Sequence, residues 1–322
     1  MYRGRFAPSP TGDLHLGSAA AALVAWLSAR AQGGRLVLRV EDLDAPRTVA
    51  GAAARQLADL RWLGLDWDEG PDVGGPHAPY RQSERTARYD AALADLARRG
   101  LVYWCDCSRA EIARAASAPH PGDEGPRYPG TCRSRGMRER TWKRPPALRL
   151  RVPDRVVTVA DALHGPVTQH VADEVGDFVL ARGDGVHAYQ LAVVVDDLAM
   201  GVTEVVRGAD LLASAPRQAL LAELLGGSPP AFAHVPLVLA ADGARLAKRA
   251  RGATIRDLRA AGRSPADVVG LLARTLGLGE AGTGPLEARA LLARFDRHAL
   301  AGRREVRLDP LRPYGAERLG TR

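Results

Sequence analysis

The sequence predicts an α/β protein built on a doubly wound parallel sheet of Rossmann type, because strand-like and helix-like segments alternate along it. A short strand, RGRFAP, precedes a helix expected from about Gly17 to Gln32. A second apolar strand, RLVLRVED at 35–42, ends in two carboxylates. The alternation breaks after about residue 100 and resumes at FVLARGDG, beyond residue 177. The stretch between is therefore interpreted as an insertion into one fold.

Helical spacing and stop signals define the helices of the first 100 residues. Apolar residues recur at helical spacing after Gly17, and Gly33 ends that helix. A second helix is expected at about 47–63. Ser83 is expected to cap a third helix, which ends at Gly100.

The chain is expected to divide into four parts. The insertion holds all three cysteines, a loop rich in Gly and Pro, and short strand-like pieces such as ALRLRVP. The last 70 or so residues have a helical pattern interrupted by Gly and Pro. We expect the first half of the Rossmann domain at 1–100, the insertion at 101–177, the second half at 178–255, and a short helical C-terminal remnant at 256–322.

The amino-acid composition is typical of a globular protein, and the net charge is positive. Apolar residues make up 46% and charged residues 25% of the 322 residues, which is typical of folded domains. The net charge of +8 favours a phosphate-rich partner such as nucleic acid, although a general excess of arginine gives the same value. No stretch approaches the roughly 18 apolar residues of a membrane span, and the N-terminus lacks the apolar core of a secretory signal. We expect a cytoplasmic monomer with no membrane partner.

The connection between the first strand and the first helix has the features of a phosphate site. In an open parallel sheet, ligands bind at the carboxyl ends of the strands. Gly12 and Gly17 let the backbone approach a ligand, and the helix that begins near Gly17 directs unpaired N–H groups outward. His15 can donate a hydrogen bond to a phosphate oxygen. The alternative is an ordinary connection that carries a surface histidine.

Four segments resemble the class I glutamyl-tRNA synthetases. FAPSPTGDLHLGS resembles the signature of that family, with HLGS at 15–18 in place of its HIGH motif. LRVEDLD at 38–44 is similar to a strand end of the family, and AYQLAVVVDDLAMGVTEVVRGADLL at 188–212 to the second half of its active site. RLAKR at 245–249 lies where the family's KMSKS-type loop belongs. The segments keep the family's order over about 245 residues, which chance does not explain.

The resemblance implies adenylation of an amino acid by ATP with Mg²⁺. The substrate carboxylate attacks the α-phosphate, so catalysis rests on positioning and on stabilising charge that grows on the phosphates. His15 and Lys248 are the implied catalytic donors, and Gly17 joins them in the ATP site. Without the resemblance, Lys248 would be interpreted as a solvated lysine on a Gly-containing loop. The family has Ser where this chain has Ala247 and Lys where it has Arg245, which bears on rate and not on reaction type.

L-Glutamate is the amino acid that the resemblance implies. Arg5 and Arg207 would each pair with one substrate carboxylate, and Glu41 would accept from the ammonium group. A surface salt bridge between Arg207 and Asp210 is the alternative for that arginine. The implied glutamate-binding residues are Arg5, Ala7, Ser9, Glu41, Tyr189 and Arg207.

The three cysteines predict a metal site. Cys105 and Cys107 are followed by Cys132, within a 28-residue window. Zinc favours four tetrahedral ligands, and on chemistry alone His120 would be the fourth. The resemblance implies Tyr128 instead, because smaller relatives of these synthetases carry a Cys-x-Cys…Tyr-x3-Cys zinc site in this insertion. One structural Zn²⁺ would fold an insertion that lacks a core of its own. Three reduced cysteines without metal are the alternative.

The C-terminal part resembles one subgroup of the family. About 70 residues follow the lysine loop, too few for the anticodon-binding domain of a full-length glutamyl-tRNA synthetase. Together with the insertion, this resembles the glutamyl-Q tRNA(Asp) synthetases, which activate glutamate without tRNA and transfer it to the queuosine base in the anticodon loop of tRNA(Asp). The implied partners are ATP, L-glutamate and tRNA(Asp) that contains queuosine.

Basic residues of the insertion are candidates for phosphate contacts with tRNA, and solvated surface charge is the alternative for each. These candidates are Arg133, Arg135, Arg138, Arg140 and Lys143, with Arg303 and Arg304 in the tail. Two other functions stay open: a truncated synthetase that charges the 3′ end of tRNA(Glu), and an inactive tRNA-binding paralogue.

Overall fold

A computed structural model describes residues 1–115, 127–138, 140–240, 242–244, 246, 254–279 and 284–308. Within these residues, none of the helices is both long and apolar enough to cross a membrane. The strands are β1 (Arg3–Phe6), β2 (Arg35–Leu38), β3 (Val102–Cys105), β4 (Ala147–Leu150), β5 (Val156–Asp161), β6 (Gly165–His170), β7 (Val179–Ala181), β8 (Glu204–Gly208), β9 (Ala231–Val235), β10 (Leu237–Leu239) and β11 (Glu305–Arg307). The α-helices are α1 (Leu16–Ala31), α2 (Ala52–Trp62), α3 (Thr86–Arg98), α4 (Arg109–Ala115), α5 (Val171–Glu174), α6 (Tyr189–Ala199), α7 (Ala215–Leu224), α9 (Ile255–Ala260) and α10 (Pro265–Leu276). Short 3-10 helices are Ala45–Arg47, Gln82–Glu84, Arg133–Arg135, Ala209–Ser214, Ala288–Arg294 and Arg297–Leu300.

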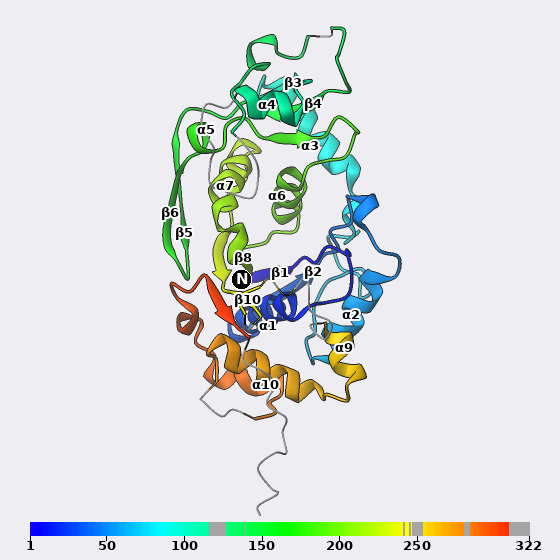
Figure 1. Ribbon diagram of the computed structural model, residues 1–322, viewed down its shortest axis with the longest axis vertical. Coiled ribbons are helices and arrows are strands. Elements are labelled where there is room, and N and C mark those ends of the chain that lie inside the picture. The colour runs from blue at the N-terminus through cyan, green and yellow to red at the C-terminus, as the bar shows by residue number, and fades with distance from the viewer. Residues whose placement is uncertain are drawn as a thin grey trace, which may run out of the picture.

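A six-stranded sheet forms the centre of the molecule, in the order β2-β1-β8-β9-β5-β6. Each neighbouring pair is parallel except β5 and β6, which form an antiparallel hairpin at one edge. The predicted α/β class is therefore confirmed, with a mixed and not a purely parallel sheet. Figure 1 shows β1 and β2 in the middle of an elongated molecule, with β3, β4 and α4 at one end and α9 and α10 at the other.

Both faces of this sheet are buried, because neighbouring strand residues enter different cores. Leu36 and Val206 belong to the core that includes α1 and α10. Val37 and Val205, one residue away in each strand, belong to the core that includes α6 and α7. Side chains alternate between the faces of a strand, so the near-continuous apolar runs of β2 and β8 fit a sheet covered on both sides. Arg5 and Arg207 lie on strands of this sheet and are themselves buried.

The range 101–177 contributes to two sheets. β3 and β4 form a separate antiparallel sheet with β7, and the cysteine-bearing segment lies next to it. β5 and β6 instead extend the central sheet, where Asp161 pairs with Phe232 of β9. The range 101–177 is thus bound into the main sheet by a hairpin, and it supplies two of the three strands of the small sheet.

Two expected boundaries differ for identifiable reasons. The strand expected at 35–42 ends at Leu38, because its neighbour β1 gives way to a turn in which Pro8 and Pro10 have no N–H to donate. Ser83 does not cap the third helix. Its backbone N and its hydroxyl both donate to the Asp42 carboxylate, at 2.8 and 2.9 Å, and α3 begins only at Thr86.

The C-terminal region contains helices, as its pattern predicts, and also a strand. Ser264 caps α10 through a reciprocal capping box with Asp267, and Gly277 ends the helix in the left-handed conformation at φ 76°. β11 then pairs in parallel with β10, the strand that leads toward the lysine loop. The C-terminal region therefore packs against the segment that follows β9.

Candidate active site and metal site

A cavity of about 960 Å³ opens at the carboxyl ends of β1 and β8, beside the N-terminus of α1. It lies where an open parallel sheet binds its ligands. Its walls combine the Pro- and Gly-containing turn after β1, the segment after β2, and the start of the segment after β8. The lining residues are Phe6, Ala7, Pro8, Ser9, Thr11, Gly12, Asp13, Leu14, His15, Ser18, Glu41, Asp44, Arg47, Thr48, Gln56, Gly208, Asp210, Leu211, Leu246 and Thr254.

His15 is the N-cap of α1 and borders this cavity. Its Nδ1 accepts from the backbone N of Ser18 at 3.1 Å, so Nδ1 must hold a lone pair and the proton of the neutral ring sits on Nε2. Burial lowers the pKa of His15, which favours that neutral ring. A Cβ at Gly17 would lie 3.1 Å from His15 Nδ1, so glycine lets the ring fold over the helix end. His15 Nε2 lies 2.9 Å from the Ser18 hydroxyl. Because this nitrogen carries the ring proton and borders the cavity, it can donate a hydrogen bond to a phosphate oxygen.

Arg5 lies buried on β1 with part of its hydrogen-bonding capacity unused. Its Nη1 donates to Val206 O at 3.0 Å, whereas Nε is 3.6 Å from Asp197 and has no hydrogen-bond partner among the described residues. Burial lowers the pKa of Arg5, the carboxylate of Asp197 opposes this effect, and the nearby charges of Arg39 and Arg207 add to it. An anionic ligand at this place would relieve that repulsion.

Glu41 is held by a residue that the sequence motifs did not single out. Arg39, completely buried, donates from Nη2 to Glu41 Oε1 at 3.0 Å and from Nη1 to Asp197 Oδ1 at 2.7 Å. Burial raises the pKa of Glu41, against the opposing effects of Arg39 and Arg5. The arginine thus compensates two buried carboxylates and aims one of them at the cavity.

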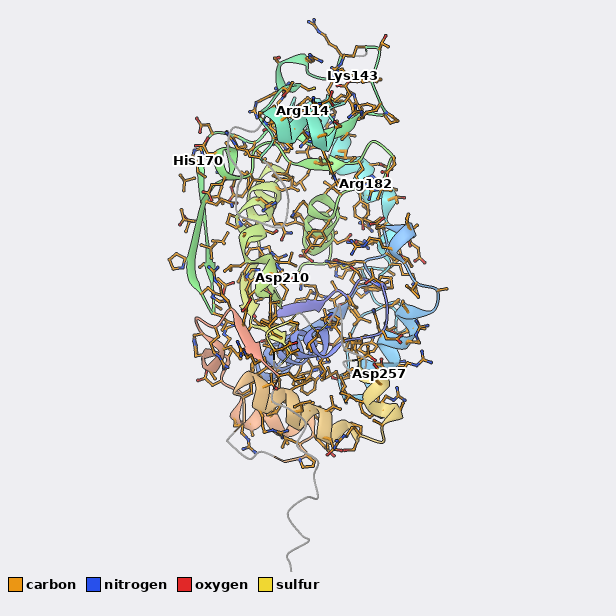
Figure 2. The ribbon with its side chains drawn as sticks, in the orientation of Figure 1. Arg114, Lys143, His170, Arg182, Asp210 and Asp257 are labelled. Atoms are coloured by element: carbon orange, nitrogen blue, oxygen red, sulfur yellow. The ribbon has the colours of Figure 1, made fainter. Side chains whose placement is uncertain are left out.

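Arg207 is engaged by a polar network and not by a surface salt bridge. Its Nε donates to His234 Nε2 at 3.0 Å, and its Nη1 donates to Gln218 Oε1 at 2.7 Å. The Tyr189 hydroxyl lies 3.4 Å from Nη1. Asp210, the alternative partner, is exposed and borders the cavity near the middle of the molecule (Figure 2).

The structure brings most of the expected ligand residues to one place. Ala7, Ser9, His15 and Glu41 line the cavity directly, and the two arginines and Tyr189 lie on the strands and helix around it. Lys248, with Ala247 and Arg245, lies outside the described residues.

The structure nevertheless describes residues on both sides of the segment that contains Lys248. Leu246 and Thr254, on either side of it in sequence, both line the cavity. Thr254 forms an isolated bridge with His15, and the N–H of Ile255 donates to Leu14 O at 2.8 Å. The described residues that flank the lysine segment therefore both lie at the edge of the same cavity.

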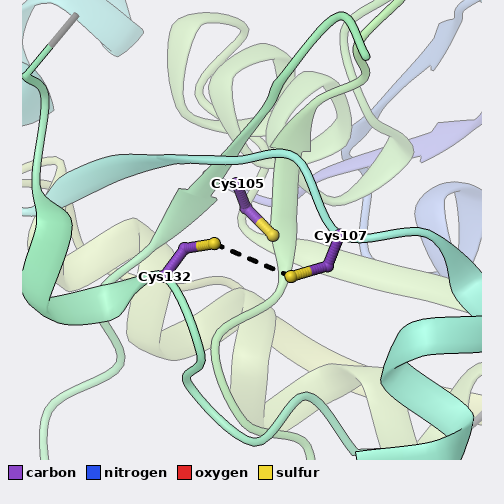
Figure 3. A group of neighbouring side chains, drawn as sticks. All are labelled: Cys105, Cys107 and Cys132. Atoms are coloured by element: carbon purple, nitrogen blue, oxygen red, sulfur yellow. Dashed lines mark hydrogen bonds between the residues drawn. The ribbon is translucent and has the colours of Figure 1, made fainter. Parts of the chain in front are cut away.

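The three cysteines meet at the end of β3, at the far end of the molecule from α10 (Figures 1 and 3). The Sγ atoms of Cys105, Cys107 and Cys132 lie within 4.8 Å of one another, and those of Cys107 and Cys132 are 3.6 Å apart. Tetrahedral zinc with Zn–S bonds of about 2.3 Å separates two sulfur ligands by about 3.8 Å. The spacing fits that ion.

The Tyr128 hydroxyl lies beside the sulfur cluster. Its hydroxyl oxygen is 3.3 Å from Cys105 Sγ and 3.9 Å from Cys107 Sγ. Burial and the hydrogen bond with Cys105 raise the pKa of Tyr128, and burial raises the pKa of Cys107 to about 12. A bound cation would offset both effects. His120, the other candidate, lies outside the described residues.

Positive charge surrounds this cluster. The Arg149 guanidinium lies 3.9 Å from the centre of the Tyr128 ring. Arg140 Nη2 is 3.7 Å from Cys132 Sγ and 3.1 Å from the Asp106 carboxylate. Two cations beside three sulfurs match the negative charge that a thiolate-bound zinc centre carries.

The sequence motifs did not identify several residues that build the site. Arg39 and Asp197 stand inside quoted segments, LRVED and VVVDD, but their roles depend on contacts between residues more than 150 positions apart. His234 is a single histidine within the apolar stretch FAHVPL. Charged residues within an apolar run were the available signal, since such groups are buried only with partners.

Comparisons with known proteins agree with this geometry. The family model described as the catalytic domain of class I tRNA synthetases (E and Q) matches residues 1–290. A glutamyl-Q tRNA(Asp) synthetase of Nitratidesulfovibrio vulgaris is 55% identical over 282 residues, which cover 86% of this chain and 87% of that protein. Glutamate–tRNA ligase 2 of Acidithiobacillus ferrooxidans is 46% identical over 91% of this chain, but the match covers 61% of that longer protein. Among solved structures, a glutamate tRNA ligase from Elizabethkingia meningosepticum in complex with its amino acid has a TM-score of 0.75 and 28% identity, covering 96% of this chain and 67% of that one.

Proposed function

Since this chain belongs to the family of class I tRNA synthetases of the E and Q type, we propose that it activates L-glutamate with ATP and transfers the glutamyl group to queuosine in tRNA(Asp). The protein is a ligase of the aminoacyl-tRNA synthetase type. Activation precedes any contact with tRNA in this proposal. The name of the 55% identical relative supports the choice of acceptor.

The pair of buried arginines is the observation that carries the choice of glutamate. Arg5 and Arg207 present two guanidinium groups on adjacent strands, β1 and β8. A dicarboxylic amino acid can satisfy both cations, and Glu41 supplies the negative charge that its ammonium group needs. Ser9 and Tyr189 add hydroxyl groups for orientation.

Adenylation would proceed by positioning. A carboxylate oxygen of glutamate attacks the α-phosphorus of ATP, and the bond to the departing pyrophosphate breaks. We assign His15 Nε2–H as one donor to the phosphates, Lys248 as a second, and the helix end at Gly17 as the backbone contribution. Mg²⁺ would enter with ATP and neutralise charge on the phosphates. The activated glutamyl group would then pass to the modified base, with AMP as the leaving group.

One structural zinc ion would be held by Cys105, Cys107, Cys132 and Tyr128. It would supply cross-links that a small segment without a large core needs. The described core beside the cysteines is a cluster of only five buried residues. Three of them are the proposed ligands Cys105, Tyr128 and Cys132, and the other two are Tyr103 and Ile112. Metal would therefore contribute to the fold of the region and not to adenylation.

We further propose that residues 1–100 and 178–255 form the two halves of the catalytic domain around the insertion at 101–177, with 256–322 as a helical remnant. Arg135 and Arg138 are exposed on the insertion and are the best candidates there for tRNA phosphates. Arg133, Arg140 and Lys143 already pair with carboxylates in this structure.

Purified protein, ATP and radiolabelled glutamate test the proposal in two steps. Glutamate-dependent exchange between ATP and pyrophosphate is expected without tRNA. With total tRNA, label is expected only on queuosine-containing tRNA(Asp), and nuclease mapping should place it in the anticodon loop. An absence of exchange would favour the inactive paralogue.

A second function is supported by the 46% identity to a glutamate–tRNA ligase. Such an enzyme would charge the 3′ end of tRNA(Glu). Label on tRNA(Glu) from cells with and without queuosine would support this function and contradict the first.

A further inference from the structure

Arg207 ends a buried row of three polar side chains that begins at Asp161. Asp161 closes β5, His234 lies on β9 and Arg207 lies on β8, which are adjacent strands. Asp161 Oδ2 is 2.6 Å from His234 Nδ1, and His234 Nε2 is 3.0 Å from Arg207 Nε. Arg207 and His234 are register partners in a parallel pair, so their side chains share a face of the sheet. The side chains of Asp161 and His234 are completely buried.

The two partners fix the protonation state of His234. Arg207 Nε–H can only donate, so His234 Nε2 must present a lone pair. The one ring proton of the neutral imidazole then sits on Nδ1 and is donated to Asp161. The lowered pKa of His234, which burial causes, agrees with a neutral ring.

Asp161 is itself held by the backbone. Its Oδ1 accepts from the N–H groups of Leu163 and His164, at 2.9 and 3.0 Å. Its Oδ2 accepts from the backbone N–H of His234 at 3.1 Å, in addition to the ring. These donors require an ionised carboxylate, which cannot rotate without losing several hydrogen bonds at once.

The row determines how the guanidinium of Arg207 is presented. His234 holds the Nε edge, Gln218 accepts from Nη1, and Leu211 O lies 3.3 Å from Nη2. The group is therefore restrained on three sides. A bidentate contact with a carboxylate needs such a fixed plane, because both N–H groups must point at it together.

We propose that Asp161 and His234 are positioning residues, which orient Arg207 for one carboxylate of the substrate. The inference rests on the proposed function, in which Arg207 binds glutamate. Asp161 sets the tautomer of His234, and His234 sets the rotation of the guanidinium. Asp161, at the end of β5, thus acts on the substrate-binding Arg207 through the imidazole ring of His234.

Two substitutions of the same residue separate orientation from packing. His234→Leu removes the acceptor for Arg207 Nε, whereas His234→Gln can place an amide oxygen near the position of Nε2. In glutamate-dependent pyrophosphate exchange, His234→Leu should raise the KM for glutamate roughly ten- to a hundredfold, with little change in the KM for ATP. His234→Gln should restore most of the glutamate KM. Val159→Ala, a cavity substitution on β5, is the matched control and should lower the melting temperature without changing either KM.

A double-mutant cycle tests the order of action. Asp161→Asn turns an amide N–H toward His234 and forces its proton onto Nε2, against Arg207. As a single substitution, Asp161→Asn should raise the KM for glutamate. In the His234→Leu protein it should raise that KM little further, because both residues act through one contact. Additive effects would contradict the relay.

The outcomes distinguish this inference from the proposed function. If the unmodified protein gives no exchange with glutamate, the proposed function fails and the inference falls with it. If exchange occurs but His234→Leu changes both KM values equally, or His234→Gln does not restore the glutamate KM in a folded protein, the inference alone is wrong.

Discussion

Arg39 Nη2 donates to Glu41 Oε1 at 3.0 Å although the arginine is completely buried. The opposite edge of the same guanidinium is 2.7 Å from Asp197 Oδ1. One cation therefore holds two carboxylates, one beside the cavity and one on α6. Loss of this cation would leave both buried carboxylates without their nearest compensating charge, with only Arg5 nearby among the described residues.

Arg39→Met is therefore expected to destabilise the fold by about 3–5 kcal/mol and to weaken glutamate binding through Glu41. Urea denaturation gives the free energy of unfolding, and pyrophosphate exchange gives the KM for glutamate. Arg35→Met is the control, because Arg35 lies only four residues earlier but is half exposed, and its change should stay within about 0.5 kcal/mol. An Arg39→Met protein as stable as the unmodified one would contradict the role of Arg39 in compensating these two carboxylates.

Tyr128→Phe tests the fourth metal ligand. The phenol oxygen lies 3.3 Å from Cys105 Sγ, and phenylalanine removes it with little loss of volume. We expect the purified unmodified protein to hold one zinc ion per chain by elemental analysis. Tyr128→Phe should lose that ion to a chelator at a concentration roughly tenfold lower or less.

His120→Ala is the matched variant for the competing ligand. If that protein loses zinc and Tyr128→Phe does not, the assignment of Tyr128 is wrong. In either case, removal of the metal should lower the melting temperature while leaving pyrophosphate exchange measurable below it. The reason is that β3, which ends at Cys105, lies apart from α1, whose first residues border the cavity (Figure 1).

The α/β class and the order of the motifs were predictable because they depend on local patterns. Strand–turn–helix alternation and the HLGS segment can be recognised within about twenty residues. The end of β2 and the partner of Ser83 were not predictable, since the first depends on prolines in the turn that follows the neighbouring strand β1, and the second on Asp42.

The residues that hold the expected ligand-binding side chains in place could not be predicted from local sequence patterns either. Glu41 and Arg207 stand in recognisable segments, but the groups that hold them come from other parts of the chain. His234 meets Arg207 across 27 positions and Asp161 across 73. β11 returns beside β10 through the same kind of long-range pairing, which an apolar pattern three residues long cannot specify.

The stability of the protein should fall in mildly acidic solution. Burial, reinforced by the charge of Arg207, lowers the pKa of His234 despite its hydrogen bond to Asp161. The folded chain therefore binds this proton less readily than the unfolded chain, and the contribution to stability is complete above about pH 6.5. It is lost as pH falls toward the lower folded pKa, at no more than about 1.4 kcal/mol per pH unit for one histidine.

Urea unfolding between about pH 7.5 and 5.5 measures this slope. His234→Gln carries no titrating group at the position and should have a shallower slope than the unmodified protein. His15, whose pKa is also lowered by burial, remains in both proteins and contributes equally. Identical slopes would mean that the pKa of His234 does not change on folding.

Lys248 offers a chemically selective test, because the chain has only two lysines among its 45 basic residues, Lys143 and Lys248. In a chain that otherwise uses arginine, a lysine between two anchors at the cavity edge, Leu246 and Thr254, fits a role that needs a compact ammonium group. Lys248→Ala should lower the rate of pyrophosphate exchange at saturating substrates roughly a hundredfold or more. Lys143→Ala should leave that rate unchanged, because Lys143 is exposed at the far end of the molecule and pairs with Glu111 (Figure 2).

Amine labelling locates Lys248 without relying on activity. Periodate-oxidised ATP forms a Schiff base with a lysine amine near the nucleotide, and reduction makes the bond permanent. Peptide mapping of the Lys143→Ala protein should place the label on Lys248, and excess ATP should prevent it. Because Lys248 would be the only lysine in that variant, label confined to the N-terminal amine would place Lys248 out of reach of the ribose dialdehyde. That result, together with an unchanged exchange rate for Lys248→Ala, would make the assignment of Lys248 to ATP wrong.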